Sequence, residues 1–341
     1  MSIVLSALQY LGYILIFPGF LFCFVVGLLL SGIDRKVVAM MQKRVGPPVL
    51  QPFYDFFKLC GKETIIPAAA SKAMFLMAPL VGLASLVVLQ LFIPIFNFTA
   101  FSGMADIIVI LYLLLIPALA MILGGAASGS PYAGVGLSRE MVTIISCELP
   151  LVLVLLAVGK TVGSATGEGL TFSFTAIAAY QAVNGSLVLK ASMIPAAIAM
   201  LMVIPGETGN HPFDAAEAET EICEGLLAEY SGAPLGVYKL SHAIKMLTLT
   251  SMFVALFLGG IGTGIENLVA AIGLSGAAAG GVVTLLGAVV LFLLCVVLTV
   301  VSISFVHAVT ARLKIEQIFK FYWSTVSGLA LISLVLAWYG L

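Results

Sequence analysis

Charged residues are scarce in this 341-residue chain, where Asp, Glu, Lys and Arg together make up only 9% of the sequence. Hydrophobic residues make up 62%, and the mean hydropathy is +1.20. A soluble domain of this composition would have to expose a very large apolar surface. The composition therefore excludes a soluble protein and predicts an integral membrane protein.

The chain also lacks clustered metal ligands. Its five cysteines lie far apart with no CxxC pair, and its three histidines form no cluster and no haem-like pair on two spans. We therefore expect no metal, iron–sulfur cluster or haem in this chain. The cysteines are interpreted as small buried apolar residues, and no catalytic residue is expected.

No Lys or Arg precedes Arg35, so the first apolar run lacks the basic flank of a cleaved signal, and it is too long for one. We expect it to remain as a membrane helix. The sequence also shows no inverted repeat and no matching pair of broken helices. That absence argues against an independent secondary transporter.

An all-α polytopic fold is predicted, since a spanning helix needs about 20 mainly apolar residues. The sequence contains eight such segments, although a Gly- and Ala-rich stretch at 261–280 leaves seven or nine open. The predicted spans are 8–31, 73–97, 105–124, 138–159, 186–205, 236–260, 279–303 and 318–340. We interpret residues 1–341 as a single membrane domain.

Basic residues predict the orientation of these spans. Thirteen Lys and Arg residues fall in or beside the odd loops, against two, Lys160 and Lys190, in the even loops. Cytoplasmic loops carry an excess of Lys and Arg. We therefore expect an inner (cytoplasmic) membrane protein with cytoplasmic odd loops at about 32–72, 125–138, 206–235 and 304–317 and with both termini outside.

The stretch 205–232 holds seven of the sixteen acids. If residues from Pro212 onward formed one helix, Asp214, Glu217, Glu221 and Glu224 would share a face about 80 degrees wide. Like charges packed in a low-dielectric site raise one another's pKa, which would allow proton exchange. The alternative is a solvated acidic loop. Ala218, Ile222 and Leu226 are predicted to form a separate apolar edge.

Two further residues are candidates for proton transfer. Glu148 lies among apolar neighbours in the fourth span, so it must find a partner, reach water or be protonated. Its alternative role is a structural partner for another helix. His242 stands within one turn of Lys239 and Lys245, either as a proton relay or as a hydrogen-bonded histidine at a helix entrance.

Loop one contains MQKRVGPPVLQPFYDFFKLCGKE, in which Phe53, Phe56, Phe57 and Cys60 lie on one side of a short helix. This pattern predicts an amphipathic interfacial helix. The alternative is a basic loop that only follows the positive-inside rule.

This segment, SREMVTIISCELP and PFDAAEAETEICEGLLAEYSG together resemble the subunit next to the hydrophilic arm in respiratory complex I and in group 4 energy-converting [NiFe] hydrogenases, the NuoH-like family. The motifs keep the family's order and comparable spacings over about a fifth of the chain. The compact GPPxxQPxxD form and the SREM pattern look like the hydrogenase branch. So does His242, where complex I versions tend to have a carboxylate.

The resemblance implies a non-catalytic subunit that couples ferredoxin-dependent hydrogen evolution, or its reverse, to proton or sodium translocation. It implies NiFe-hydrogenase-like large and small soluble subunits with a NiFe centre and iron–sulfur clusters, antiporter-like membrane subunits, ferredoxin indirectly, lipid, and no nucleic acid. Arm docking is assigned to Arg35, Arg44, Asp55 and Lys58. Proton relay or coupling is assigned to Arg139, Glu148, Glu207, Asp214, Glu217, Glu219, Glu221, Glu224, Glu229 and His242.

Two alternatives remain open at this point. One is a complex-I-type oxidoreductase in which this subunit supplies part of a quinone or phenazine site. The other is a purely structural membrane anchor without an ion path, in which Glu148 would matter for assembly but not for coupling.

Overall fold

The computed structural model describes residues 2–96, 98, 101, 106–167, 169–271 and 277–340, and side chains from residue 9 onward except Glu219 and residues 277–278. Helices dominate the described chain, as predicted. The long helices are α1 (Ser2–Leu15), α2 (Phe20–Met41), α4 (Lys72–Phe92), α5 (Ile107–Ser128), α6 (Pro131–Thr166), α8 (Ile194–Thr208), α10 (Gly232–Phe257), α12 (Ala277–Thr299) and α15 (Ser327–Tyr339).

Eight helical runs are long and apolar enough to cross a membrane within the described residues, which confirms the predicted number. The first run reaches Met41 rather than residue 31, so the first charges of loop one belong to α2. The stretch after the sixth span forms α11 (Ile261–Ala271), whose 11 residues are too few to span a membrane. Residues 272–276, in the rest of that stretch, lie outside the described part.

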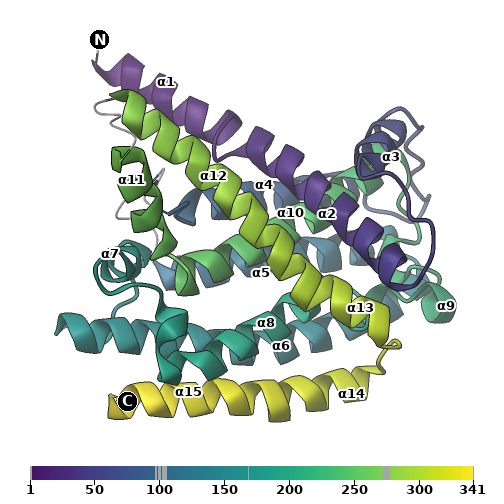
Figure 1. Ribbon diagram of the computed structural model, residues 1–341. Coiled ribbons are helices and arrows are strands. Elements are labelled where there is room, and N and C mark those ends of the chain that lie inside the picture. The colour runs from purple at the N-terminus through teal and green to yellow at the C-terminus, as the bar shows by residue number, and fades with distance from the viewer. Residues whose placement is uncertain are drawn as a thin grey trace.

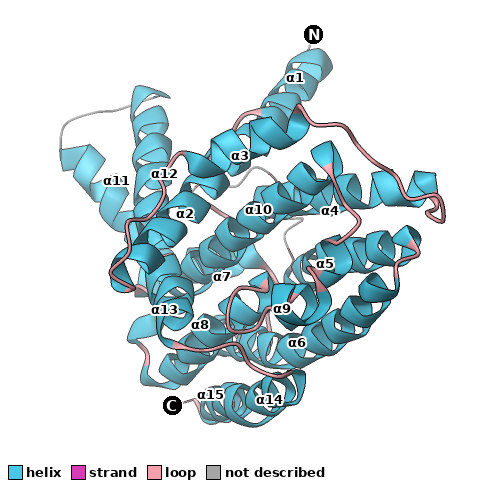
Figure 2. Cartoon of the chain, turned by 90° about the vertical axis from the view of Figure 1, so that its right-hand side faces the viewer, coloured by secondary structure: helices cyan, strands magenta, loops and turns pink. Residues whose placement is uncertain are grey.

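The odd loops meet at one end of the bundle, where α3 (Gln51–Cys60), α9 (Glu219–Ile222) and α13 (Phe305–Val309) lie (Figures 1 and 2). The chain's two ends and α7 (Phe174–Asn184) lie at the other end (Figure 1). Loop one is joined to loop five by the Ile65 amide, which donates to Ser231 Oγ at 3.0 Å. Loop seven is joined to loop five by the Leu313 amide, which donates to the Pro212 carbonyl at 3.1 Å.

The central element is α10. In its most apolar 18-residue stretch, 94% is buried inside the protein. It packs against α2, α4, α8 and α12. A helix that is surrounded on all sides needs no polar face toward water. Lys245, whose side chain is mostly buried, must therefore find a partner inside the protein, whereas Lys239 near the start of the helix is exposed.

Helix α3 lies across α2 and α10, and its predicted apolar side is confirmed for Phe53 and Phe56 but not for Cys60, which is exposed. The prediction that the cysteines are buried is likewise wrong for Cys60 and Cys223. Phe53 and Phe56 pack on Phe24 of α2, with ring centroids 5.9 and 5.2 Å away. Phe57 and Tyr54 remain exposed. The short helix thus has one buried and one exposed aromatic side, which suits a position at a membrane boundary.

The seventh and eighth spans each contain a π-helical segment near the odd loops, at Val300–Ser304 and Phe321–Val326. Between them lie α13, a short link and α14 (Ile315–Lys320). Ser304 Oγ in the first π segment donates to Asp34 Oδ1 of α2 at 2.6 Å. The two π-helical segments therefore lie on either side of the stretch of α13, link and α14 in which Arg312 is found.

Gly32 of α2 allows the turn before α3 to approach the helix, and this contact generates our first prediction. A Cβ at Gly32 would overlap the backbone carbonyl of Val49, whereas one at Gly134 of α6 would meet nothing within 4 Å. Gly32→Ala should lower the unfolding free energy by about 1–3 kcal/mol, read as a lower thermal midpoint in fluorescence-detected size-exclusion chromatography. Gly134→Ala is the control, and equal midpoints for both variants would contradict the prediction.

Candidate functional site

The acidic stretch does not form one helix, so the predicted helical wheel is wrong. It folds as a 3₁₀ turn at Ala215–Glu217, the four-residue α9 and a second 3₁₀ turn at Gly225–Leu227. Cys223, Glu224 and Gly225 have φ angles of 50°, 67° and 49°. A right-handed helix cannot continue through three left-handed residues. The predicted apolar edge is confirmed, because Ala218, Ile222 and Leu226 are all buried.

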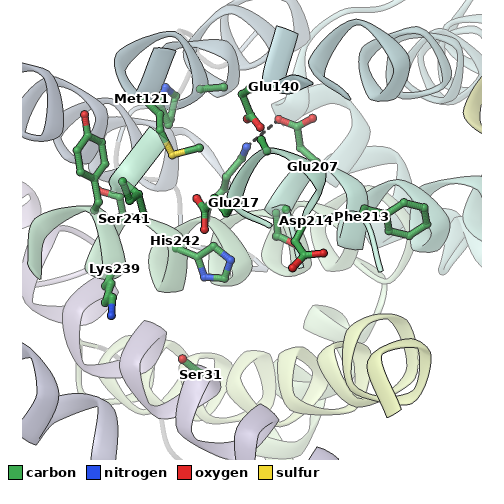
Figure 3. Close-up of a pocket in the computed structure, with 18 of the residues that line it drawn as sticks. Ser31, Met121, Glu140, Glu207, Phe213, Asp214, Glu217, Lys239, Ser241 and His242 are labelled. Carbon is green, nitrogen blue, oxygen red and sulfur yellow. Dashed lines mark ion pairs between the residues drawn. The ribbon is translucent and has the colours of Figure 1, made fainter. Parts of the chain in front are cut away.

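Beneath this loop lies a cavity of about 260 Å³, enclosed by the loop and by α2, α4, α5, α6, α8 and α10. Figure 3 shows carboxylates and basic side chains facing each other across it. Its ionisable lining residues are Arg35, Glu140, Glu207, Asp214, Glu217, Glu224, Lys239, His242 and Lys245. Three of the four acids predicted to share a face therefore do line one cavity, although the loop and not a helix brings them there.

The deepest charged contact in the cavity joins Lys245 of α10 to Glu207 of α8. The ammonium and carboxylate are 3.1 Å apart, and the two side chains are only 11% and 4% exposed. Glu140 of α6 interacts electrostatically with both of them. One lysine thus faces two carboxylates, and this arrangement carries net negative charge unless a proton is bound.

Asp214 closes one side of the cavity and is held from outside it. Arg312 donates two hydrogen bonds, Nε to Oδ1 at 2.8 Å and Nη2 to Oδ2 at 2.5 Å. His211 Nδ1 lies 3.0 Å from Oδ1. Burial raises the pKa of Asp214, but the hydrogen bonds and charges of His211 and Arg312 outweigh burial, so its pKa is lowered. Asp214 is therefore a fixed anion that clamps the loop.

Glu217 has the opposite environment. Burial and then the neighbouring carboxylates of Glu140, Asp214 and Glu224 raise its pKa to about 7, against a smaller lowering by Lys239. At neutral pH a carboxyl group with this pKa is divided between its protonated and ionised forms. Asp214 and Glu217 lie three residues apart on one loop, yet their environments move their pKa values in opposite directions. This divergence is typical of sites that handle protons.

The remaining predicted acids lie outside the cavity. Glu221 pairs with Arg139 Nη1 at 2.5 Å, and its side chain is half exposed. Glu148 is half-buried on α6 and has no hydrogen bond or ion pair within the described part of the chain, but it interacts electrostatically with Glu207. Glu229 is exposed. The side chain of Glu219 lies outside the described residues.

His242 lines the cavity, as Figure 3 shows, and it interacts electrostatically with Lys245 and Arg35 and is hydrogen-bonded to the backbone of Thr208. The hydrogen bond to Thr208 is the kind of contact expected if His242 is a hydrogen-bonded structural histidine, which is one of its two predicted roles. The relay role stays a prediction.

The four residues assigned to arm docking lie at the odd-loop end. Arg35 pairs with Asp55 at 3.3 Å on a partly exposed surface and also reaches the cavity lining. Arg44 hydrogen-bonds to Gln42, and Lys58 is exposed on α3. Arg35, Asp55 and Lys58 thus place charges of both signs on and beside α3. Their docking role stays a prediction.

Sequence reasoning missed Glu140, the role of Lys245 as the partner of Glu207, and Arg312 as the clamp on Asp214. Glu140 and Glu148 are eight residues apart, which on a helix is a rotation of only about 80 degrees. A wheel drawn for α6 would have placed both on neighbouring sides. The pairs formed with α10 and loop seven carry no comparable sequence signal, because they depend on how separate helices pack.

A bundle of eight spans with a carboxylate-lined cavity beneath its odd loops defines a polytopic membrane protein with a buried, charged cavity. In the described residues, no group of three or more His, Cys, Asp and Glu could hold a metal ion. Residues 14–338 match the NADH dehydrogenase family (NADHdh), and the chain belongs to that family.

The chain is similar to membrane subunits of several respiratory complexes. It is 36% identical to hydrogenase-4 component C of Escherichia coli over 67% of this chain and 70% of that one. It is 36% identical to a subunit of the NADH-quinone oxidoreductase of Thermomicrobium roseum over 67% and 72%. A chain of the archaeal membrane-bound sulfane sulfur reductase superposes with a TM-score of 0.82 at 29% identity, covering 97% and 98%. The chain is thus a membrane subunit of the complex-I-like type.

The buried pair between Lys245 and Glu207 generates a second prediction. Removing one partner leaves an uncompensated buried charge, so Lys245→Met and Glu207→Gln should each lower the unfolding free energy by about 3–5 kcal/mol. Lys245→Met should cost more, because Glu140 also loses its cation. The double variant should cost less than the sum of the two, as measured by thermal midpoints in a double-mutant cycle. Additive costs would show that the two groups do not interact.

A third prediction concerns the proton on Glu217. Because its pKa is raised to about 7, the folded protein holds this carboxyl group protonated below that pH and ionised above it. Infrared difference spectra recorded between mildly acidic and mildly alkaline pH should show a carboxylic acid C=O band that is lost as the pH rises through neutrality. Glu217→Gln should lack this band and Glu229→Gln should keep it. A band of equal size in both variants would assign the proton elsewhere.

Proposed function

We propose that this chain is the membrane-anchoring and energy-coupling subunit of an energy-converting [NiFe] hydrogenase, linking ferredoxin-dependent hydrogen evolution or its reverse to proton or sodium translocation. The relatives named hydrogenase-4 component C and formate hydrogenlyase subunit 4, the latter 33% identical over 69% of this chain, support the hydrogenase branch. The compact form of loop one and the SREM motif support it as well. In this proposal the redox centres belong to soluble partner subunits that dock on the odd-loop end.

The observation that carries the proposal is the excess of carboxylates over cations in the cavity beneath the odd loops. Five acids and three Lys or Arg residues line it, so its charge depends on bound protons. A partner subunit that moves the acidic loop would change the distance of Glu217 and Glu224 from Glu140 and Glu207. Such a change shifts proton affinity within the cavity. Redox work at the partner thereby becomes proton movement in the membrane.

Lys245 provides the switch in this proposal. It pairs with Glu207 and also interacts electrostatically with Glu140. A cation shared by two carboxylates stabilises the ionised form of whichever it contacts, so a shift of Lys245 toward Glu140 would favour protonation of Glu207. Glu148, which interacts electrostatically with Glu207, is the next acceptor on the same side. The charge would leave toward membrane-embedded, antiporter-like partners.

A second candidate function is supported by the structural match that spans nearly the whole chain. The solved relative comes from a sulfane sulfur reductase, and the match covers 97% of this chain with a TM-score of 0.82. In this alternative the subunit couples ion movement to reduction of a sulfur substrate by its partner. The cavity would work in the same way. The composition of the co-purifying complex and its reduction of protons or of polysulfide separate the two candidates.

The fourth prediction tests coupling in membrane vesicles that contain the whole complex. Glu207→Gln and Glu217→Gln remove carboxyl groups from the cavity, so each should lower ion translocation per hydrogen formed by about tenfold or more while electron transfer continues. Glu266→Gln is the matched control, because that exposed residue lies on α11 at the other end. An unchanged ratio in both cavity variants would eliminate the ion path and leave a structural anchor.

A further inference from the structure

A second cavity, separate from the charged one, opens on the outer surface between α6 and α14. Its volume is about 490 Å³. Figure 2 shows both helices at the edge of the bundle, on the odd-loop side. The lining combines polar and apolar groups from two helices, with Ser138, Arg139 and Val142 on α6 and Ile315, Phe319 and Lys320 on α14.

The position of this groove corresponds to the boundary between lipid tails and headgroups. The eighth span begins at Ile315, so the groove lies within its first turns. Phe319 stacks on Trp323 with ring centroids 5.0 Å apart, and both rings are partly exposed. Exposed aromatic residues of this kind are enriched where a spanning helix crosses the membrane interface. On the neighbouring helix α6, the exposed side chains of Val142 and Ile145 extend the apolar surface away from the groove.

The rim of the groove offers cationic donors. Within the described residues, the Lys320 ammonium has no hydrogen bond or ion pair. Both hydrogen bonds that the Arg139 side chain donates in the described chain use Nη1, one to Ala215 O at 3.2 Å and one to Glu221. Its Nη2 and Nε groups remain for a ligand. Glu316 also lines the groove. Its negative charge opposes that of Arg139 and Lys320 and so reduces the preference of the groove for an anionic ligand over a zwitterionic one.

We propose that this groove binds an anionic phospholipid. The phosphate would lie between Arg139 and Lys320 with the Ser138 hydroxyl as a further donor, and an acyl chain would follow Val142 and Phe319. A basic pocket between spanning helices on the cytoplasmic side is the arrangement that recognises anionic headgroups. The positive-inside distribution predicts that this end is cytoplasmic, where such lipids concentrate.

The site would connect the lipid to the charged cavity through a single side chain. Arg139 contacts the acidic loop at two points, the Ala215 carbonyl and Glu221. A phosphate that binds Nη2 and Nε would fix the guanidinium, which has five donors in a rigid fork. The lipid would thereby restrain the loop that covers the cavity.

Lipid retention by the intact complex tests the proposal. The complex is reconstituted in phosphatidylcholine nanodiscs with a minor fraction of phosphatidylglycerol, extracted in detergent, and the retained lipids are counted by native mass spectrometry. Wild type should retain phosphatidylglycerol in preference to phosphatidylcholine. Lys320→Gln should lower this retention by about fivefold, the effect of one basic residue near a membrane surface. Val142→Trp, which fills the groove, should abolish it.

Lys72→Gln is the matched control, since this exposed lysine begins a spanning helix at the same end but lies outside the groove. Equal retention in wild type, Lys320→Gln and Val142→Trp would overturn the proposal. So would equal retention of the two lipids, or a protein subunit protected at this face instead of a lipid. Displacement of phosphatidylglycerol by millimolar inorganic phosphate alone would show a free-anion site and would also overturn it.

Discussion

The ion pair between Lys245 and Glu207 is the constraint on which the rest of the cavity depends. Each charge alone in an apolar bundle would cost several kcal/mol, and together they are tolerable because α8 and α10 bring them to 3.1 Å. Glu140, on α6, then completes a group in which one cation serves two anions. The packing of three helices and the proton content of the cavity are therefore set by the same contact.

The acidic loop is held at two points by arginines that lie outside the cavity. Arg312 clamps Asp214 from loop seven, and Arg139 holds Glu221 from α6. The buried apolar side chains of Ala218 and Ile222 also anchor the loop in the bundle. Glu217 lines the cavity, and its pKa is raised because it is buried and lies near the carboxylates of Glu140, Asp214 and Glu224. Because Arg139 and Arg312 pair with other acids of the loop, neither of them neutralises Glu217.

The sequence was sufficient for the number and order of spans, because twenty apolar residues in a row have few alternatives in a membrane. It also located the acidic loop beside the other odd loops, since positive charges mark one end. It failed on the form of that loop, where the left-handed Cys223 and Glu224 interrupt a pattern that reads as helical. It failed as well on Lys245 with Glu207, because a contact between helices leaves no local signal. Those contacts follow from tertiary packing, in which residues distant in sequence become neighbours.

The arginine that pairs with Asp214, Arg312, lies in a stretch of chain that has a π-helical segment on each side. Each holds an extra residue relative to an α-helix, and converting one to α-helix shifts the residues after it by 1.5 Å and about 100 degrees. The two segments enclose α13, the link that carries Arg312 and α14. A gain of the extra residue in one segment with its loss in the other would turn this whole stretch, while the parts of the seventh and eighth spans beyond the two segments would keep their register. The residue that holds Asp214 thus lies between two places where the helical repeat departs from that of an α-helix.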